Sequence, residues 1–128
     1  MLFDTTFLID LQREAVRRAP GKAFGFLEAR GDAPVLISII TYGEMSEGFT
    51  ADARADFLSL MEPYQVIGLT QEIAWRYGQI SRRLRQDGAS IGDNDLWIAC
   101  TALEVDAELV TRDRRHFDRV SGLRLATY

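Results

Sequence analysis

Four carboxylates stand alone beside runs of apolar or small residues. Asp4 and Asp113 each follow a short apolar run, Glu44 lies in a small and apolar segment, and Asp95 precedes an apolar helical pattern. A lone charge in such surroundings is costly unless it is paired or bound to a cation. Carboxylates that converge with no lysine among them repel one another, and a hard divalent ion removes that repulsion. Mg²⁺ or Mn²⁺ completes its shell with substrate phosphate, so the acids favour phosphate chemistry.

Other kinds of reactive site find little support. His116 is the only histidine and Cys100 the only cysteine, so no ligand spacing indicates zinc. No serine lies in a strand-to-helix elbow of the type G-x-S-x-G, and no glycine-rich nucleotide-binding loop is present. We assign no role to His116 and interpret Cys100 as a small buried residue in a reduced setting.

The segments that must position the acids alternate between short strands and helices. Apolar runs of four or five residues, bounded by polar or turn residues, are typical of strands, and they cover residues 1–4, 36–40, 65–69, 108–111 and 123–126. Helical patterns lie between them, at residues 5–13, 21–30, 39–48, 52–61 and 71–86. This alternation predicts an α/β fold, a three-layer α/β/α sandwich around a short, mainly parallel sheet.

A further helix follows the loop at residues 87–94. We expect Asp93 or Asn94 to cap this helix and Asp95 to lie in its first turn. In an open α/β sheet, ligands bind beyond the carboxyl ends of the strands, where two of the four acids stand. The four carboxylates are therefore predicted to share one pocket.

Length and composition limit the class of protein. The 128 residues make one ordinary domain, and 47% hydrophobic with 27% charged residues is enough for a packed core. No apolar run approaches the roughly 18 residues of a membrane span. The N-terminus has no basic segment of the kind that begins a signal peptide, so we expect a cytoplasmic location.

The net charge of −4 gives no general attraction to nucleic acid. Two arginine clusters nevertheless suit phosphate groups: Arg82, Arg83 and Arg85, and Arg112, Arg114 and Arg115.

Four segments carry a resemblance to a known family: residues 2–10 (LFDTTFLID), 39–44 (IITYGE), 91–99 (IGDNDLWIA) and 109–117 (LVTRDRRHF). In order and spacing they resemble the PIN-domain ribonucleases, and among them the VapC-type toxins of bacterial toxin–antitoxin pairs. The resemblance covers the whole length and implies a single PIN-like nuclease domain over residues 1–128. It also implies Mg²⁺- or Mn²⁺-dependent cleavage of RNA phosphodiester bonds, a VapB-like antitoxin as partner, and a homodimer.

The resemblance gives the acids their roles. It implies a catalytic pocket formed by Asp4, Glu44, Asp95 and Asp113, with Asp4 and Asp95 as the principal metal ligands. Asp93 departs from the family pattern, which leaves a choice between Asp93 and Asp95 for the metal. We favour Asp95 because it aligns with the family's position.

Supporting residues follow from the same resemblance. Thr6 matches a hydroxyl that helps to hold the first aspartate, Thr111 lines the pocket, and Asn94 precedes the helical aspartate. Arginines suit the RNA backbone, and the candidates for this contact are Arg85, Arg112 and Arg114.

Two other functions stay open at this point. The domain could be a non-catalytic RNA- or protein-binding module on the same fold, although loss of one or more acids would be its mark. It could also be an Asp-based phosphatase or phosphoacceptor, but such enzymes usually carry a second aspartate where Thr6 stands. The resemblance also implies an apolar groove for an antitoxin helix; Met45, Phe49 and Met61 are candidates for its lining, although core packing is the commoner explanation for such residues.

Overall fold

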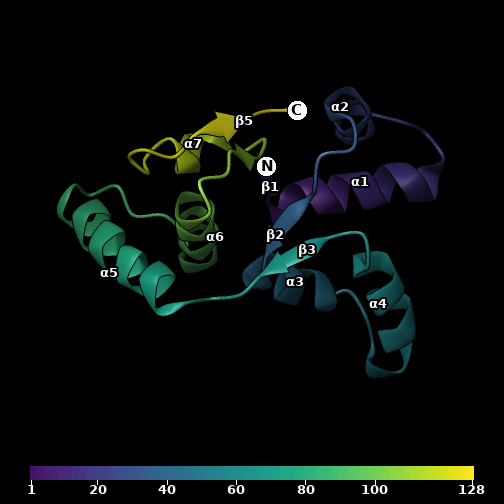
Figure 1. Cartoon of the computed structure of the whole chain (residues 1–128), viewed down its shortest axis with the longest axis horizontal. Helices are drawn as coiled ribbons and strands as arrows, with labels where there is room; N and C mark the ends of the chain where they lie inside the picture. Colours follow the sequence, from purple (N-terminus) through teal and green to yellow (C-terminus); the bar gives the residue numbers. More distant parts are fainter.

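A five-stranded sheet forms the centre of the computed structural model, which describes residues 1–128 (Figure 1). The strand order is β3-β2-β1-β4-β5, and all neighbours are parallel. The strands are short: β1 (Leu2–Phe3), β2 (Leu36–Ser38), β3 (Gln65–Ile67), β4 (Leu109–Val110) and β5 (Leu125–Ala126). In the central strand, Leu2 lies opposite Leu36 of β2 and Leu109 of β4. The predicted α/β/α sandwich around a short parallel sheet is confirmed.

Helices cover both faces of this sheet, because successive side chains of a strand point to opposite sides. Leu2 and Leu109 enter a core with residues of α5, α6 and α7, whereas Phe3, Ile37 and Val110 enter a second core with residues of α1 to α4. The helices are α1 (Thr5–Arg17), α2 (Lys22–Arg30), α3 (Ile39–Ser46), α4 (Arg54–Met61), α5 (Gln71–Gln86), α6 (Asp93–Glu104) and α7 (Arg114–Phe117), with a 3₁₀ turn at Ala51–Ala53. None of them is both long and apolar enough to span a membrane.

The helix boundaries test the sequence pattern closely. The predicted helix 71–86 has the same bounds as α5. Its start is fixed by Thr70, whose hydroxyl accepts the Ile73 amide and so caps the helix. Helix α1 continues four residues beyond its predicted end and stops where Arg18 adopts a left-handed backbone (φ 51°). The expectation that Asp93 or Asn94 caps α6 is wrong, because Gly92 is the N-cap and both residues already lie within the helix.

Candidate active site

Asp4 lies at the junction between β1 and α1 and is only 4% exposed. One carboxylate oxygen accepts the Phe7 amide at 2.8 Å, so Asp4 is also the N-cap of α1. The other oxygen accepts the hydroxyl of the fully buried Thr111, which comes directly after β4. Two neighbouring strands of the sheet therefore fix this carboxylate at their carboxyl ends.

Glu44 reaches the site from α3. Its Oε1 accepts the Thr5 hydroxyl at 3.1 Å, which ties α3 to the first turn of α1. The Thr5 hydroxyl also lies 3.3 Å from that of the buried Thr41. The Ser38 hydroxyl accepts the Thr41 amide at 3.0 Å and so caps α3 at the end of β2. This chain of hydroxyls orients a carboxylate that would otherwise turn to solvent.

The two aspartates of the first turn of α6 face different ways. Asp93 is exposed and accepts the hydroxyl of Tyr77 at 3.0 Å, and the Tyr77 ring stacks on Trp97 with 3.9 Å between centroids. Asp95 is half-buried, and one of its oxygens lies within 4.8 Å of ligand atoms of Asp113 and His116. Asp95 therefore joins the cluster, while Asp93 is held against α5.

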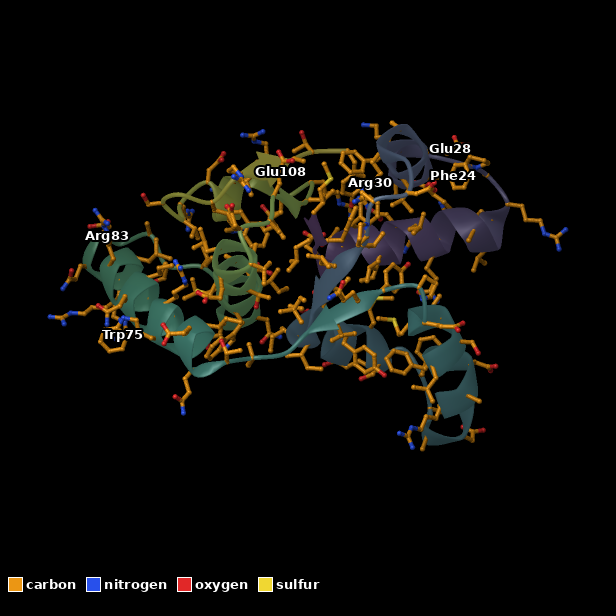
Figure 2. The ribbon with its side chains drawn as sticks, viewed as in Figure 1. Phe24, Glu28, Arg30, Trp75, Arg83 and Glu108 are labelled. Atoms are coloured by element: carbon orange, nitrogen blue, oxygen red, sulfur yellow. The ribbon has the colours of Figure 1, made fainter.

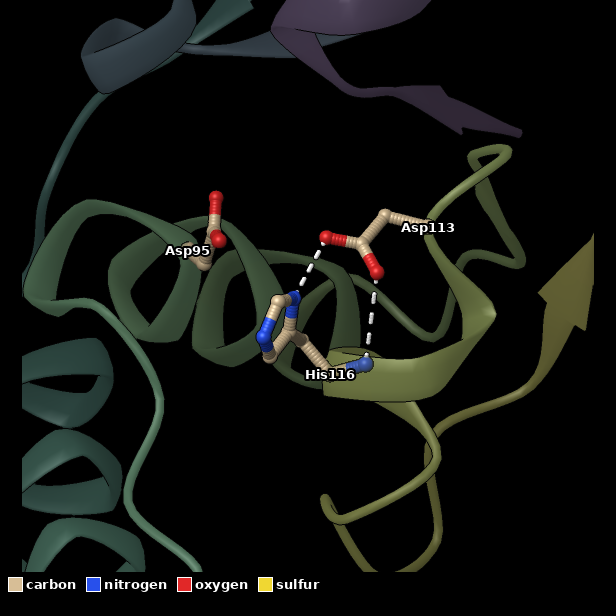
Figure 3. Close-up of side chains that lie close together, drawn as sticks. All are labelled: Asp95, Asp113 and His116. Carbon is tan, nitrogen blue, oxygen red and sulfur yellow. Dashed lines mark hydrogen bonds and ion pairs between the residues drawn. The ribbon is translucent and has the colours of Figure 1, made fainter.

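Asp113 follows β4 and caps the short helix α7. One oxygen accepts the His116 amide at 3.4 Å, and the other lies 2.6 Å from Nδ1 of the His116 ring. Figure 3 shows the side chains of Asp95, Asp113 and His116 gathered together, with the dashed hydrogen bonds joining His116 to Asp113. The hydrogen bond from His116 holds the pKa of Asp113 below its ordinary value. His116, to which the sequence assigned no role, therefore contacts the site directly.

The electrostatics link all four acids. Burial raises the pKa of Asp4 to about 6, against the hydrogen bonds from Thr111 and Phe7, and the charges of Asp95 and Asp113 raise it further. Burial is also the main cause that raises the pKa of Glu44 and of Asp95, and each feels a further carboxylate of the group. No arginine or lysine forms an ion pair with any of the four. A group of carboxylates that has no lysine or arginine partner fits a hard divalent cation.

The supporting residues named from the sequence fall in different places. Thr111 holds Asp4, but the Thr6 side chain makes no hydrogen bond, and the first-turn hydroxyl that reaches the site is that of Thr5, on Glu44. Asn94 is exposed and its side chain likewise makes no hydrogen bond. Thr5 and His116 are the residues that the sequence missed, although one follows Asp4 and the other lies three residues after Asp113, within reach of its carboxylate in a helical turn.

The three arginines expected to contact RNA do not form one group. Arg112 lies beside the site, and its guanidinium pairs with Asp10 of α1 at 2.8 Å. Arg114 begins α7 and lies 3.6 Å from Asp118, the residue that follows this helix, and Arg85 belongs to the exposed end of α5. Of the three arginines, only Arg112 therefore forms an ion pair with α1, the helix that begins after Asp4.

Comparison with known proteins gives the same fold and the same family. The family model described as "PIN domain" matches residues 1–123. "Ribonuclease VapC1" of Methanocaldococcus jannaschii is 33% identical over 129 residues, which cover 100% of this chain and 86% of the relative. "Ribonuclease VapC1" of Haemophilus influenzae strain R2866 is 36% identical over 95 residues, 70% of each chain. A solved structure of VapBC-1 from nontypeable Haemophilus influenzae superimposes with a TM-score of 0.80 at 27% identity, over 98% of this chain and 96% of that one.

Proposed function

Because the chain belongs to the PIN-domain family, within its VapC group, we propose that it is a Mg²⁺-dependent endoribonuclease and the toxin of a toxin–antitoxin pair. The observation that carries the metal-dependent part is that Asp4, Glu44, Asp95 and Asp113, from four separate segments, act on one another electrostatically, and that none of them pairs with a lysine or arginine. Mn²⁺ has the same ligand preferences and is the alternative ion. Residues 1–128 act as one nuclease domain in this proposal.

The residues of the site have distinct tasks. Asp4 and Asp95 would hold the ion, which supplies an activated water and stabilises charge on the phosphate oxygens. Thr111 and the Phe7 amide keep the Asp4 carboxylate in one orientation. Preorganised groups of this kind cost no reorganisation during the reaction.

Glu44 and Asp113 complete the pocket, each with a partner of its own. Thr5 orients Glu44 by its hydroxyl, and His116 orients Asp113 by its ring. The pKa of Glu44 is raised and that of Asp113 is lowered, so Glu44 is the better proton acceptor and Asp113 the more permanent anion.

A pair of neighbouring aspartates provides the test. Asp95→Asn removes a charge inside the cluster, whereas Asp93→Asn makes the same change two residues away on an acid that faces Tyr77. Cleavage of a labelled single-stranded RNA is measured with Mg²⁺ and with excess chelator. We expect the Asp95→Asn variant to lose at least about a hundredfold in rate, and the Asp93→Asn variant to remain close to the wild type. Cleavage that survives chelation or the Asp95→Asn change would refute the metal-dependent mechanism.

An antitoxin of the VapB type is the protein partner. An apolar cavity of about 480 Å³ lies between α1 and α4, lined by Leu8, Leu11, Ala15, Val16, Met45, Leu60 and Tyr64 among others. We place an amphipathic helix of the antitoxin there, because such helices bury their apolar face in a groove of this kind. Of the residues expected in the groove, Met45 lines it, whereas Met61 is buried in the core and Phe49 packs on Phe57.

Two further parts of the proposal concern assembly and location. A homodimer would bring the arginine-bearing surfaces of two acidic chains together and concentrate their positive potential. Sedimentation of the isolated chain tests this. A cytoplasmic location would place the enzyme with its RNA substrates, and cell fractionation tests it.

A further inference from the structure

A cavity of about 580 Å³ lies beside the acidic site, between α1, the turn that joins α1 to α2, and the turn after β4. The two sites share their supporting elements. Asp4 begins α1, and Arg13 and Arg17 lie further along that helix in the cavity wall. Arg112, another wall residue, stands between Thr111 and Asp113 in the chain. The cavity is therefore a lateral extension of the acidic site along α1.

Four cations line this cavity, which we call the cationic cavity: Arg13, Arg17, Lys22 and Arg112. Only two carboxylates, Asp10 and Glu14, stand against them, so the lining carries two more positive than negative charges. The whole chain, by contrast, has a net charge of −4. An excess of positive charge therefore lies next to the group of carboxylates.

Both carboxylates of the cavity are already engaged. Asp10, whose side chain is 14% exposed, accepts the Arg112 guanidinium and the Tyr128 hydroxyl, each at 2.8 Å. Glu14 accepts three backbone amides at the start of α2, those of Gly21, Ala23 and Phe24, at 2.9 to 3.1 Å. Asp10 also lies 3.8 Å from the guanidinium of Arg13. The acids therefore stabilise the walls and leave Arg17 and Lys22 without an ion pair.

Arg17 and Lys22 are the free cations. Neither forms an ion pair, and both side chains are exposed. Arg17 ends α1 and Lys22 begins α2, and the hydrogen bonds of Glu14 to the start of α2 fix the spacing between these two helices. Gly21 permits this junction, because a Cβ there would lie 2.5 Å from Oε1 of Glu14. The backbone positions of Arg17 and Lys22 are therefore fixed relative to each other.

We propose that the cationic cavity binds a backbone phosphate of single-stranded RNA that flanks the bond cut at the acidic site. This inference rests on the proposed ribonuclease function. Arginine suits phosphate because its planar fork donates two parallel hydrogen bonds. From Asp4 to Asp10, α1 rises by roughly 9 Å at about 1.5 Å per residue. A stacked strand with about 3.4 Å per nucleotide covers that distance in two to three nucleotides.

The position of the apolar groove favours RNA over the antitoxin as the occupant. Leu8, Leu11 and Ala15 of α1 line the apolar groove, whereas Arg13 and Arg17 of the same helix line the cationic cavity. At about 100° per residue these two sets lie on opposite faces of the helix. An antitoxin helix in the groove therefore lies on the far side of α1 from the cavity.

Two double variants with equal loss of charge test the proposal. Arg17→Ala/Lys22→Ala removes the free cations, and Arg54→Ala/Arg124→Ala removes two exposed cations, one at the start of α4 and one directly before β5. Arg83, which Figure 2 labels on α5 away from α1, stays in place because it belongs to an arginine cluster that suits phosphate. Both double variants are made in an Asp95→Asn background with Mg²⁺ present, so that bound RNA stays intact. Fluorescence anisotropy then gives the affinity for a labelled single-stranded RNA over a range of NaCl concentrations.

We expect the cavity variant to bind roughly tenfold more weakly, and its plot of log affinity against log salt to be shallower by about 0.7, the value for one lost phosphate contact on a single strand. The control variant should keep the parent affinity and slope. Since all four side chains are exposed, the unfolding temperatures should agree, and Arg17→Gln/Lys22→Gln serves as a second variant if they do not.

Several results would overturn the proposal. Unchanged affinity and slope in the cavity variant, or an equal loss in both variants, would remove the phosphate site. Loss of antitoxin binding with RNA binding retained would make the occupant an acidic peptide segment and would equally refute it. The enzyme proposal is judged separately, by cleavage with the otherwise unchanged chain. If that chain binds RNA through Arg17 and Lys22 but does not cut it with Mg²⁺, the cavity stands and the ribonuclease proposal falls.

Discussion

Replacement of Asp4 by asparagine should make the metal-free protein more stable at neutral pH. The Asp4 carboxyl has a pKa of about 6 in the folded chain and an ordinary value of 3.8, chiefly because burial disfavours its charge. Asparagine cannot ionise, yet its carbonyl can still accept the Phe7 amide and its NH₂ can donate to the Thr111 oxygen. Asparagine is also about as good an N-cap as aspartate. The substitution therefore removes the cost of the charge and keeps both partners, with the hydrogen bond to Thr111 reversed in direction.

The size and the pH window of the effect follow from the two pKa values. Between pH 3.8 and about 6 the folded chain holds the Asp4 proton and the unfolded chain does not, so stability falls as the pH rises through this window. At 1.36 kcal/mol for each pH unit, the total is about 3 kcal/mol above pH 7. For a domain of this size, that corresponds to an increase of about 10 °C in Tm.

Thermal and urea unfolding in excess chelator at pH 4.5 and pH 7.5 measure this directly. Asp4→Asn should raise the free energy of unfolding at pH 7.5 by most of that amount and have a much smaller effect at pH 4.5. Asp32→Asn, at an exposed loop position, is the matched control and should change neither value. Mg²⁺ should stabilise the wild type at pH 7.5, because it binds the folded state, and should stabilise the Asp4→Asn variant much less.

One outcome would refute the reasoning for Asp4. If Asp4→Asn were neutral or destabilising at pH 7.5 without metal, the carboxylate would not be held at an electrostatic cost in the folded chain. A gain of equal size at both pH values would also contradict it, since the cost exists only for the ionised group.

Two other residues give predictions of a different kind. His116→Ala should lower RNA cleavage by about tenfold or more through loss of the hydrogen bond that orients Asp113, and His116→Asn, which retains a donor, should recover part of it; equal rates for the two variants would contradict a positioning role. Val16→Glu should weaken antitoxin binding by at least about tenfold while leaving Tm unchanged, because Val16 is 78% exposed on the wall of the apolar groove. Calorimetry with the antitoxin measures this, and Leu69→Glu, also at an exposed position outside the groove, is the control.

The fold was largely predictable because its signals are local. Helix α5 has a capping threonine at its start, an apolar stripe and a glycine after its end, so its limits could be placed to the residue. Where local signals compete, the limits shifted. The predicted strand 36–40 ends at Ser38, because that side chain already caps α3. The predicted helix 5–13 continues to Arg17. In this added turn, the Glu14 side chain accepts the amide of Gly21, which precedes α2, and the sequence pattern does not reveal such a contact.

The site was predictable only in outline. Convergence of the four acids follows from the rule that ligands bind at the carboxyl ends of parallel strands. Which side chain binds each acid depends on the direction in which that side chain points from its helix. Two adjacent residues of the same type give no indication of this direction in the sequence. Thr5 and Thr6 differ by about 100° around α1, and only Thr5 reaches Glu44. The sequence favoured Asp95 over Asp93 by resemblance alone, and Tyr77 supplies the physical reason, since its hydroxyl holds Asp93 aside.

The central position of β1 affects how the protein emerges from the ribosome. The first strand made must wait for β4, one of the last, before both of its edges are paired, and the hydroxyl that seats Asp4 comes directly after β4. A nascent chain in which residue 113 has not yet left the ribosome lacks Asp113 in the pocket and has no β4 paired with β1. The pocket therefore becomes competent only after the residues around Thr111 have left the ribosome and paired with β1.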